Sequence, residues 1–280
     1  MKFKAIFCAA LMLLLEQPAL VGAADAQSAA ATALSANASF DEISKLAQAG
    51  NAEAQFQLAK RYADGQDIAQ NNAEALKWYR KAAEQGNATA QFSLGYMYAN
   101  GQGVARNSAE ALKWYRKAAA QGNAYAQTNL GLMYYEGRGM AQDFIQAMTW
   151  FRKAAEQKEA IAQNNIGWLY ANGLGVTQNY VEALKWYRKA AEQGYDKAQT
   201  NLGSMYYNGQ GVARSDAEAL KWYQKAAAQG NAVAQNNLGE MYYDGQGVAW
   251  DYAKAMELWQ KAAAQGNANA QYSLRTYGNE

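Results

Sequence analysis

The chain repeats itself every 36 residues. When the sequence is aligned with itself at that shift, six copies come into register without an insertion: 51–86, 87–122, 123–158, 159–194, 195–230 and 231–266. Residues 39–50 resemble the end of a preceding copy and predict an N-terminal capping helix, and residues 267–280 predict a C-terminal half-repeat. Strict repetition of this length is typical of solenoids, in which each unit buries its apolar surface only against its neighbours. The fold of one unit therefore determines that of nearly the whole chain.

Each copy predicts a pair of helices. In the second copy, the apolar residues of the first helix, helix A, form one stripe at helical spacing: Ala90, Leu94, Met97 and Tyr98. After a glycine-containing loop, the second helix, helix B, has its own stripe: Ala111, Leu112, Trp114, Tyr115, Ala118 and Ala119. Asn107 or Ser108 is placed to cap helix B, because a short polar side chain there accepts hydrogen bonds from the first turn. Gly122 then ends the helix in a left-handed turn.

The residues that recur match the pattern of a known family. In the second copy they are Ala90, Leu94, Gly95, Tyr98, Gly101, Gly103 and Val104, followed by Ala111, Trp114, Tyr115, Lys117, Ala118, Ala119 and Gly122. Six tandem copies of this pattern resemble the Sel1-like repeat family, and the 36-residue period argues against a 34-residue tetratricopeptide array. The resemblance implies an all-α, right-handed α-solenoid superhelix of antiparallel helix pairs. It also implies that helix A lines the concave surface and serves as a platform for partner proteins.

A few residues depart from the pattern. Lys158 replaces a closing glycine, Asp67 replaces a loop glycine, and Arg275 stands where five of the six full copies have glycine inside helix A. Gly95 and its counterparts are expected to let two helices approach closely. Arg275 suits a terminal helix that faces water. We expect these departures to change local geometry and to leave the fold intact.

The N-terminus has the features of a secretory signal peptide. Lys2 and Lys4 precede an apolar run of 11 residues, and small residues at 21–23 form a cleavage site. The run is shorter than the roughly 20 residues that span a bilayer. We therefore expect a signal peptide at 1–23, a flexible leader at 24–38 and an exported, periplasmic or secreted bacterial protein with no membrane insertion after cleavage. Cleavage would also remove Cys8, the one cysteine.

Composition argues against most catalytic chemistry. The chain has no histidine, and without Cys8 it has no cysteine, which excludes the common nucleophilic dyads and triads and nearly all zinc sites. Removing Lys2, Lys4 and Glu16 changes 26 basic and 24 acidic residues to 24 and 23, a net charge of +1. Nucleic-acid binding normally needs a concentrated basic surface. We therefore expect no enzyme activity, no cofactor, no metal and no nucleic-acid partner.

Positions that differ between copies are those free to recognise a partner. At the third and tenth positions of each copy, on the side of helix A opposite its packing stripe, apolar residues gather in copies two to four. We predict that they form one binding patch on the concave surface: Tyr96, Tyr125, Leu132, Ile161 and Trp168. Asparagines at the seventh position would hydrogen-bond an extended backbone beside it: Asn129, Asn165 and Asn201. The alternative is that these residues only complete helix packing.

These observations favour a non-catalytic adaptor that binds another protein or an extended peptide as a monomer. A second hypothesis is that the protein binds a glycan or peptidoglycan fragment through Trp168, Trp250 and the tyrosines of the same surface. The third, and weakest, is a cell-wall or β-lactam hydrolase, which the resemblance raises because some relatives have been linked to that chemistry. The absence of histidine and cysteine weighs against it.

Overall fold

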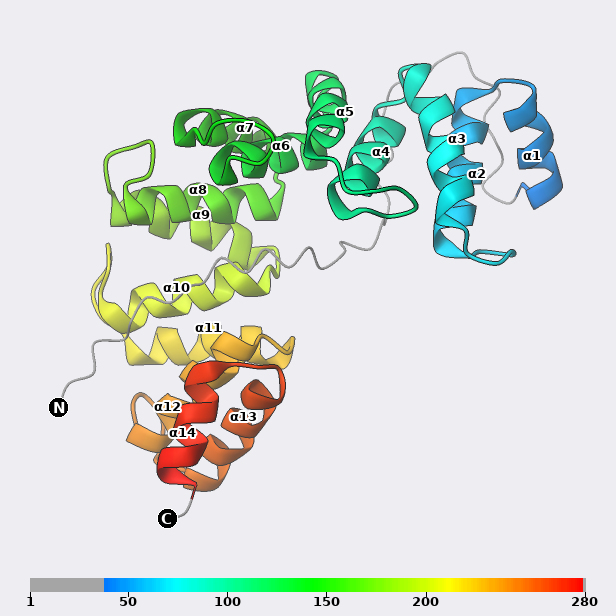
Figure 1. Cartoon of the computed structure of the whole chain (residues 1–280). Helices are drawn as coiled ribbons and strands as arrows, with labels where there is room; N and C mark the ends of the chain where they lie inside the picture. Colours follow the sequence, from blue (N-terminus) through cyan, green and yellow to red (C-terminus); the bar gives the residue numbers. More distant parts are fainter. Residues whose placement is uncertain (1–37, 279–280) are drawn as a thin grey trace. The chain divides into compact units, whose positions relative to one another are not determined.

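The computed structural model describes residues 38–278, so the predicted signal peptide and most of the predicted leader lie outside the described residues. The described part is built from helices that follow one another in chain order, each packed against the one before and the one after it (Figure 1). Within this part, no helix combines the length and apolar character needed to cross a membrane. The prediction of an all-α array of paired helices is confirmed.

The helices alternate between two kinds. Helix A of each copy corresponds to an even number: α2 (Ala52–Asp64), α4 (Ala88–Asn100), α6 (Ala124–Glu136), α8 (Ala160–Asn172), α10 (Asp196–Asn208), α12 (Ala232–Asp244) and the terminal α14 (Ala268–Tyr277). Helix B corresponds to an odd number: α1 (Phe40–Gln48), α3 (Asn72–Glu84), α5 (Ser108–Ala120), α7 (Phe144–Glu156), α9 (Tyr180–Glu192), α11 (Asp216–Ala228) and α13 (Tyr252–Ala264). Helices α2 to α13 each contain 13 residues, which reflects the uninterrupted repeat.

Polar side chains start the B helices, as the sequence predicts. Asn107 Oδ1 accepts hydrogen bonds from the backbone N–H groups of Ala109 and Glu110, both at 3.0 Å. The equivalent residue caps every other B helix of the six full copies: Asn71, Asp143, Asn179, Ser215 and Asp251. These caps satisfy donors that have no partner within the helix, and each contributes roughly 1 kcal/mol to stability.

Within a copy, a glycine in helix A allows the helix to contact an aromatic side chain of helix B closely. A Cβ atom added to Gly95 would lie 2.8 Å from Cδ1 of Tyr115, whose side chain is only 1% exposed. The same relation holds for Gly131 with Phe151 and for Gly203 with Tyr223. The prediction of close helix approach is confirmed. Arg275 occupies this position in α14 and is exposed, as expected of a helix face that contacts water.

Glutamines link the two helices of a copy and tie each copy to the one before it. Gln91, which is buried in α4, accepts at Oε1 a hydrogen bond from Nε2 of the exposed Gln121 in the same copy at 2.8 Å, and its own Nε2 donates to the backbone oxygen of Ala83 in the preceding copy at 3.0 Å. The side-chain pair recurs within each copy: Gln85–Gln55, Gln157–Gln127, Gln193–Gln163, Gln229–Gln199 and Gln265–Gln235. Because a buried amide without a partner is costly, the hydrogen bond from Gln91 to Ala83 favours one register between the two copies.

The departures from the repeat pattern keep the local backbone conformation. Lys158 and Asp67 both adopt φ of 63°, the left-handed conformation that glycine adopts at the equivalent sites of other copies. A side chain makes that conformation less favourable by about 1–2 kcal/mol. These two positions therefore store strain in a turn whose path is unchanged, and the expected change of local geometry is not observed there.

Candidate functional site

The candidate site is the helix-A face, which we define as the side of α4, α6, α8, α10 and α12 that bears the third, sixth, seventh, tenth and fourteenth residues of each copy. Its predicted members differ in exposure. Tyr125 is 37% exposed, Tyr96, Asn129, Ile161, Trp168 and Asn201 are half-buried, and Leu132 and Asn165 are buried at 9% and 6%. Leu132 and Asn165 therefore do not present the open surface expected of them.

An aromatic cluster joins α4 to α6. The ring centroid of Phe92 lies 6.4 Å from that of Tyr96 and 5.8 Å from that of Tyr125. Phe92 is itself buried, so it supports the two tyrosines from below. Burial also raises the pKa of the Tyr96 hydroxyl, which stays protonated and able to donate a hydrogen bond at neutral pH. The structure brings Tyr96 and Tyr125 together through this shared neighbour.

Sequence reasoning missed Phe92. The sixth residue of each copy reads Phe56, Phe92, Thr128, Asn164, Thr200 and Asn236, which is apolar at the start of the array and polar toward its end. That gradient was available in the sequence, but the position adjoins the packing stripe of helix A and was assigned to neither surface. The tenth position varies differently, because it is apolar in copies two to four.

Trp168 is anchored to the preceding copy. Its indole Nε1 donates to the hydroxyl oxygen of Tyr135 at 3.0 Å, and its ring packs against the core formed by Ala171, Ala183 and Leu184. Trp168 therefore contributes both to packing and to the surface that remains accessible on α8. The packing expected of the alternative hypothesis is therefore observed for part of the Trp168 ring, and the binding role stays a prediction.

The asparagines at the seventh position have different environments. Asn129 Nδ2 donates to the backbone oxygen of Tyr125 at 2.8 Å, and Asn201 Nδ2 donates to Asn164 Oδ1 at 3.0 Å. Asn165 Nδ2 is buried and donates to no acceptor within residues 38–278. A buried donor without an acceptor costs roughly 1–3 kcal/mol. Asn165 is therefore the one of these three asparagines whose side-chain nitrogen has no acceptor in the described residues, and that nitrogen is buried.

A partly buried carboxylate lies at the start of α8. Glu159 Oε2 accepts from the backbone N–H of Ala162 at 2.6 Å and from the Thr128 hydroxyl at 2.9 Å. Burial raises the pKa of Glu159, and these hydrogen bonds oppose that rise. The carboxylate caps α8 and links it to α6, so its acceptors are already in use.

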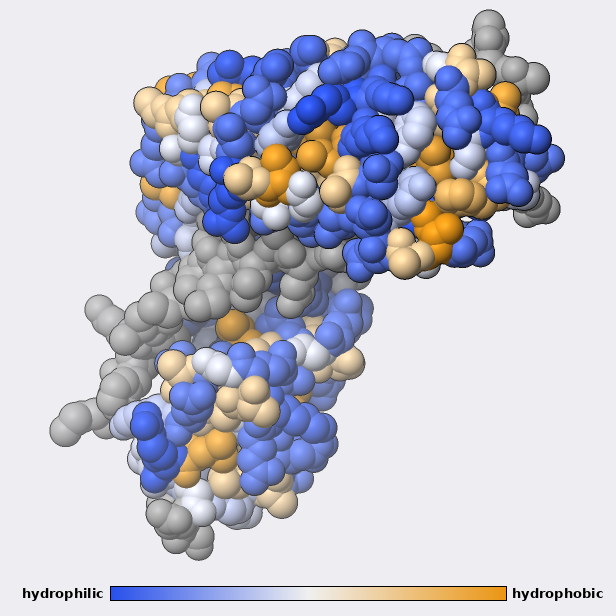
Figure 2. Space-filling view, turned by 45° about the vertical axis from the view of Figure 1, so that its right-hand side comes forward, coloured by the Kyte–Doolittle hydropathy of each residue, from blue (hydrophilic) through white to orange (hydrophobic). Residues whose placement is uncertain are grey.

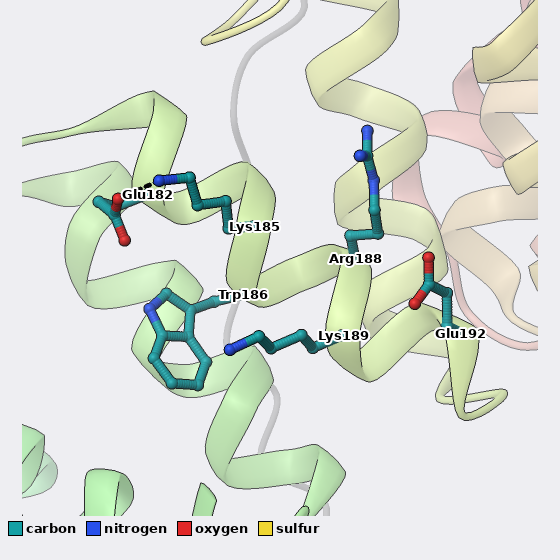
Figure 3. Close-up of a pocket in the computed structure, with 6 residues that line it drawn as sticks. All are labelled: Glu182, Lys185, Trp186, Arg188, Lys189 and Glu192. Carbon is teal, nitrogen blue, oxygen red and sulfur yellow. Dashed lines mark hydrogen bonds and ion pairs between the residues drawn. The ribbon is translucent and has the colours of Figure 1, made fainter.

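A shallow depression on helix B offers a contrast. Its lining comes from α9 alone: Glu182, Lys185, Trp186, Arg188, Lys189 and Glu192 (Figure 3). Lys185 Nζ lies 2.6 Å from Glu182 Oε1, and Lys189 Nζ lies 4.2 Å from the centre of the Trp186 ring. The same lysine–tryptophan contact recurs on α3, α5, α7 and α11. Since these charges already have partners, the depression is a repeated surface feature and not a convergent site.

One face of the molecule mixes small apolar groups with polar surroundings. Figure 2 shows hydrophobic residues gathered in small groups, each bordered by hydrophilic ones. Apolar anchors within a polar rim are the usual composition of a protein-binding surface. The described residues contain no group of three or more histidine, cysteine or acidic side chains that could hold a metal ion.

Comparison with known proteins identifies the repeat. The Sel1 repeat model matches residues 52–87, 88–123, 124–159, 160–195, 196–231 and 232–267, one residue later than the boundaries derived from self-alignment. A search of curated proteins found no match.

Solved structures share the fold. A protective antigen of uropathogenic Escherichia coli with an SLR fold is 43% identical, with a TM-score of 0.76 over 86% of this chain and 52% of that one. This chain thus spans about half the length of that relative. A Sel1 repeat protein from Oxalobacter formigenes is 37% identical, with a TM-score of 0.73 over 76% and 85% of the two chains. An immunity protein from Pseudomonas aeruginosa, 23% identical over 78% and 82% with a TM-score of 0.52, shares the fold alone.

The repeats that the model matches cover 52–267, the same residues whose stacked helices and recurring glutamine pairs the structure shows. The chain belongs to the Sel1 repeat family.

Proposed function

We propose that this protein is an exported, non-catalytic adaptor that holds another protein or an extended peptide on the helix-A face of copies two to four. Export rests on the sequence of residues 1–23. The absence of histidine and the satisfied state of the acidic pairs on helix B favour binding over catalysis. A stacked array of helix pairs is consistent with a protein-binding scaffold.

The observation that carries the proposal is the accessible aromatic and apolar surface on the helix-A face. Tyr125 is 37% exposed beside Phe92, and Ile161 and Trp168 keep part of their surface accessible on the adjacent α8. Side chains of an extended peptide would cover these residues and remove their apolar surface from water.

Site-specific crosslinking tests the proposal. A photoreactive residue at position 125 should yield adducts with a defined set of polypeptides in the native cell, and the same residue at Lys113, an exposed site on α5, should not. Mass spectrometry of the adducts identifies the partner. The Trp168→Ala variant should reduce the yield at position 125. Equal adducts from both positions would show that the helix-A face is not the binding surface.

One exposed residue favours a second candidate, the glycan binder. Trp250, in the loop before α13, is 66% exposed, and an open indole face is suited to stacking on a sugar ring. Titration with cell-wall fragments while following tryptophan fluorescence separates the candidates, because a Trp250→Phe variant would lose the response if sugars stack there. The adaptor proposal expects no response to these fragments in either protein.

A further inference from the structure

The helix-A face changes character at α12, where hydrogen-bond acceptors replace the aromatic rings. Asn236, Glu240 and Asp244 follow one another at four-residue intervals, so their side chains lie along one side of the helix. Glu240 occupies the tenth position of its copy, which Trp168 occupies in copy four. Asn236 occupies the sixth position, which Phe92 occupies in copy two.

One acceptor in this cluster is buried and unused. Asn236 is 1% exposed, and its Nδ2 donates to Glu240 Oε1 at 2.9 Å. Its Oδ1, on the same amide, accepts no hydrogen bond within the described residues. With Nδ2 directed at an ionised carboxylate, the amide leaves its oxygen as a further acceptor beside Glu240. A buried acceptor in that state favours a ligand that donates hydrogen bonds.

The carboxylates also lack a cation. In residues 38–278, the ion pairs formed by lysine and arginine involve neither Glu240 nor Asp244. Tyr207 on α10, which interacts electrostatically with Glu240, donates its hydroxyl proton to Gln246 Oε1 at 2.6 Å instead of to a carboxylate. Arg214 lies 5.3 Å from the Tyr207 ring centre, but its guanidinium is bound to Asp216 at 2.9 Å.

The local field makes these negative charges unfavourable in the free protein. Burial raises the pKa of Glu240, and the charge of Asp244 adds to the effect. Asp244 is the last residue of α12 and Glu240 lies one turn before it, close to the C-terminal end where the helix dipole is negative, and the last turn contains no basic residue. A bound cation would offset the effects of burial, of the neighbouring carboxylate charge and of the helix dipole. A desolvated carboxylate is stabilised by an opposite charge to which it is also hydrogen-bonded.

From this geometry we infer that Asn236, Glu240 and Asp244 form a docking site for a lysine or arginine side chain of the polypeptide held on the helix-A face. The inference rests on the proposed function and specifies its partner. The bound segment presents apolar or aromatic side chains to copies two to four and a basic side chain to copy six. An ammonium or guanidinium group supplies donors to both carboxylates and to Asn236 Oδ1.

The basic docking site can be tested without knowledge of the partner by selecting binders from random peptides displayed on phage. The wild-type protein should enrich peptides that contain both aromatic or aliphatic residues and lysine or arginine. The Glu240→Gln/Asp244→Asn variant should keep the apolar enrichment and lose the basic one. A Glu182→Gln/Glu218→Gln variant removes the same charge from exposed ion pairs on helix B and should select as the wild type does.

Affinity measurements complete the test. Replacing the basic residue of a selected peptide by citrulline or norleucine should weaken binding to the wild type about tenfold or more, and should leave binding to the Glu240→Gln/Asp244→Asn variant unchanged. Thermal unfolding of each variant shows that it is folded.

The outcomes separate the inference from the proposed function. Peptides selected for apolar residues alone, or a basic preference that survives in the Glu240→Gln/Asp244→Asn variant, would overturn the basic docking site and leave the adaptor intact. Failure to enrich any peptide, or enrichment unaffected by Tyr125→Ala/Trp168→Ala, would overturn both.

Discussion

The same scaffold underlies copies two to four and copies five and six, but the side chains on the helix-A face differ between the two regions. In copies two to four, the helix-A face presents Phe92, Tyr96, Tyr125 and Trp168, held together by ring contacts and one indole hydrogen bond. In copies five and six, the equivalent side presents Ser204, Asn236, Glu240 and Asp244, held by polar contacts.

The elements beneath the two faces are nearly the same. Gln157–Gln127 and Gln229–Gln199 are joined at 3.0 and 2.8 Å in copies three and five. The helix-A glycine meets a helix-B ring in both. This comparison indicates that stacking constrains the residues on one side of helix A and leaves those on the other side free to vary. The binding chemistry therefore changes along the array while the fold does not.

The largest expected effect tests whether the scaffold is shared. An added Cβ would lie 2.6 Å from Phe151 Cδ1 in Gly131→Ala and 2.8 Å from Tyr223 Cδ1 in Gly203→Ala. Overpacking of this kind lowers the unfolding free energy by about 1–3 kcal/mol. The higher helix propensity of alanine compared with glycine offsets up to about 1 kcal/mol of that loss. Thermal and urea unfolding should show similar losses for both variants. A loss confined to one variant would mean that the two regions pack differently.

The next prediction distinguishes a residue that packs on the core from one that lies mainly on the surface within copies two to four. Trp168→Ala removes a ring that packs on the core and a hydrogen bond to Tyr135, and should cost roughly 2 kcal/mol of unfolding free energy. Tyr125→Ala removes a side chain that is 37% exposed and should cost under about 1 kcal/mol. Urea unfolding measures both. Equal losses would show that Tyr125 is as much a packing residue as Trp168.

The acidic face should respond to pH in a defined direction. Because burial raises the folded-state pKa of Glu240 above its ordinary value of 4.5, folding is favoured when the group is protonated. That contribution is present below the unfolded-state pKa and is lost as pH rises through the folded-state pKa. Glu240→Gln should therefore raise stability at pH 7 by about 0.5–1 kcal/mol, and the gain should vanish near pH 4.

Thermal unfolding across this pH range measures the effect of Glu240→Gln. Glu182→Gln, which removes an exposed partner of Lys185 on α9, is the control and should change stability by at most about 0.5 kcal/mol. A gain from Glu240→Gln that is the same at every pH would show that the effect is not electrostatic.

The smallest effect concerns the turn between copies three and four. Lys158→Gly should stabilise the protein by about 0.5–1 kcal/mol, because glycine relieves the strain at φ of 63° but loses more chain entropy on folding. The reverse change, Gly194→Lys, lies at the equivalent turn with φ of 93° and open space around the added Cβ, and should destabilise by a similar amount. Thermal unfolding that shows no opposite shifts would contradict the strain argument.

Much of the architecture could be read from the repeated residues. The helix caps, the closing glycines and the close approach at Gly95 follow from local chemistry: a polar side chain before a helix, a residue without Cβ after it, and a glycine in a stripe that faces a ring. The candidate site was predictable only in outline. Variation between copies identified the tenth position, but it did not show that Phe92 supports Tyr96 and Tyr125.

The unit, its period and its two helices follow from the sequence alone, because they depend on contacts within one copy and between nearly identical neighbours. The structure was needed to show that Leu132 and Asn165 are covered, that Asn165 Nδ2 and Asn236 Oδ1 lack partners, and that Gln91 and Gln121 pair across 30 residues. Exposure and hydrogen-bond satisfaction at one side chain depend on how several helices meet around it. That arrangement depends on the summed geometry of the stack and cannot be read from any single copy.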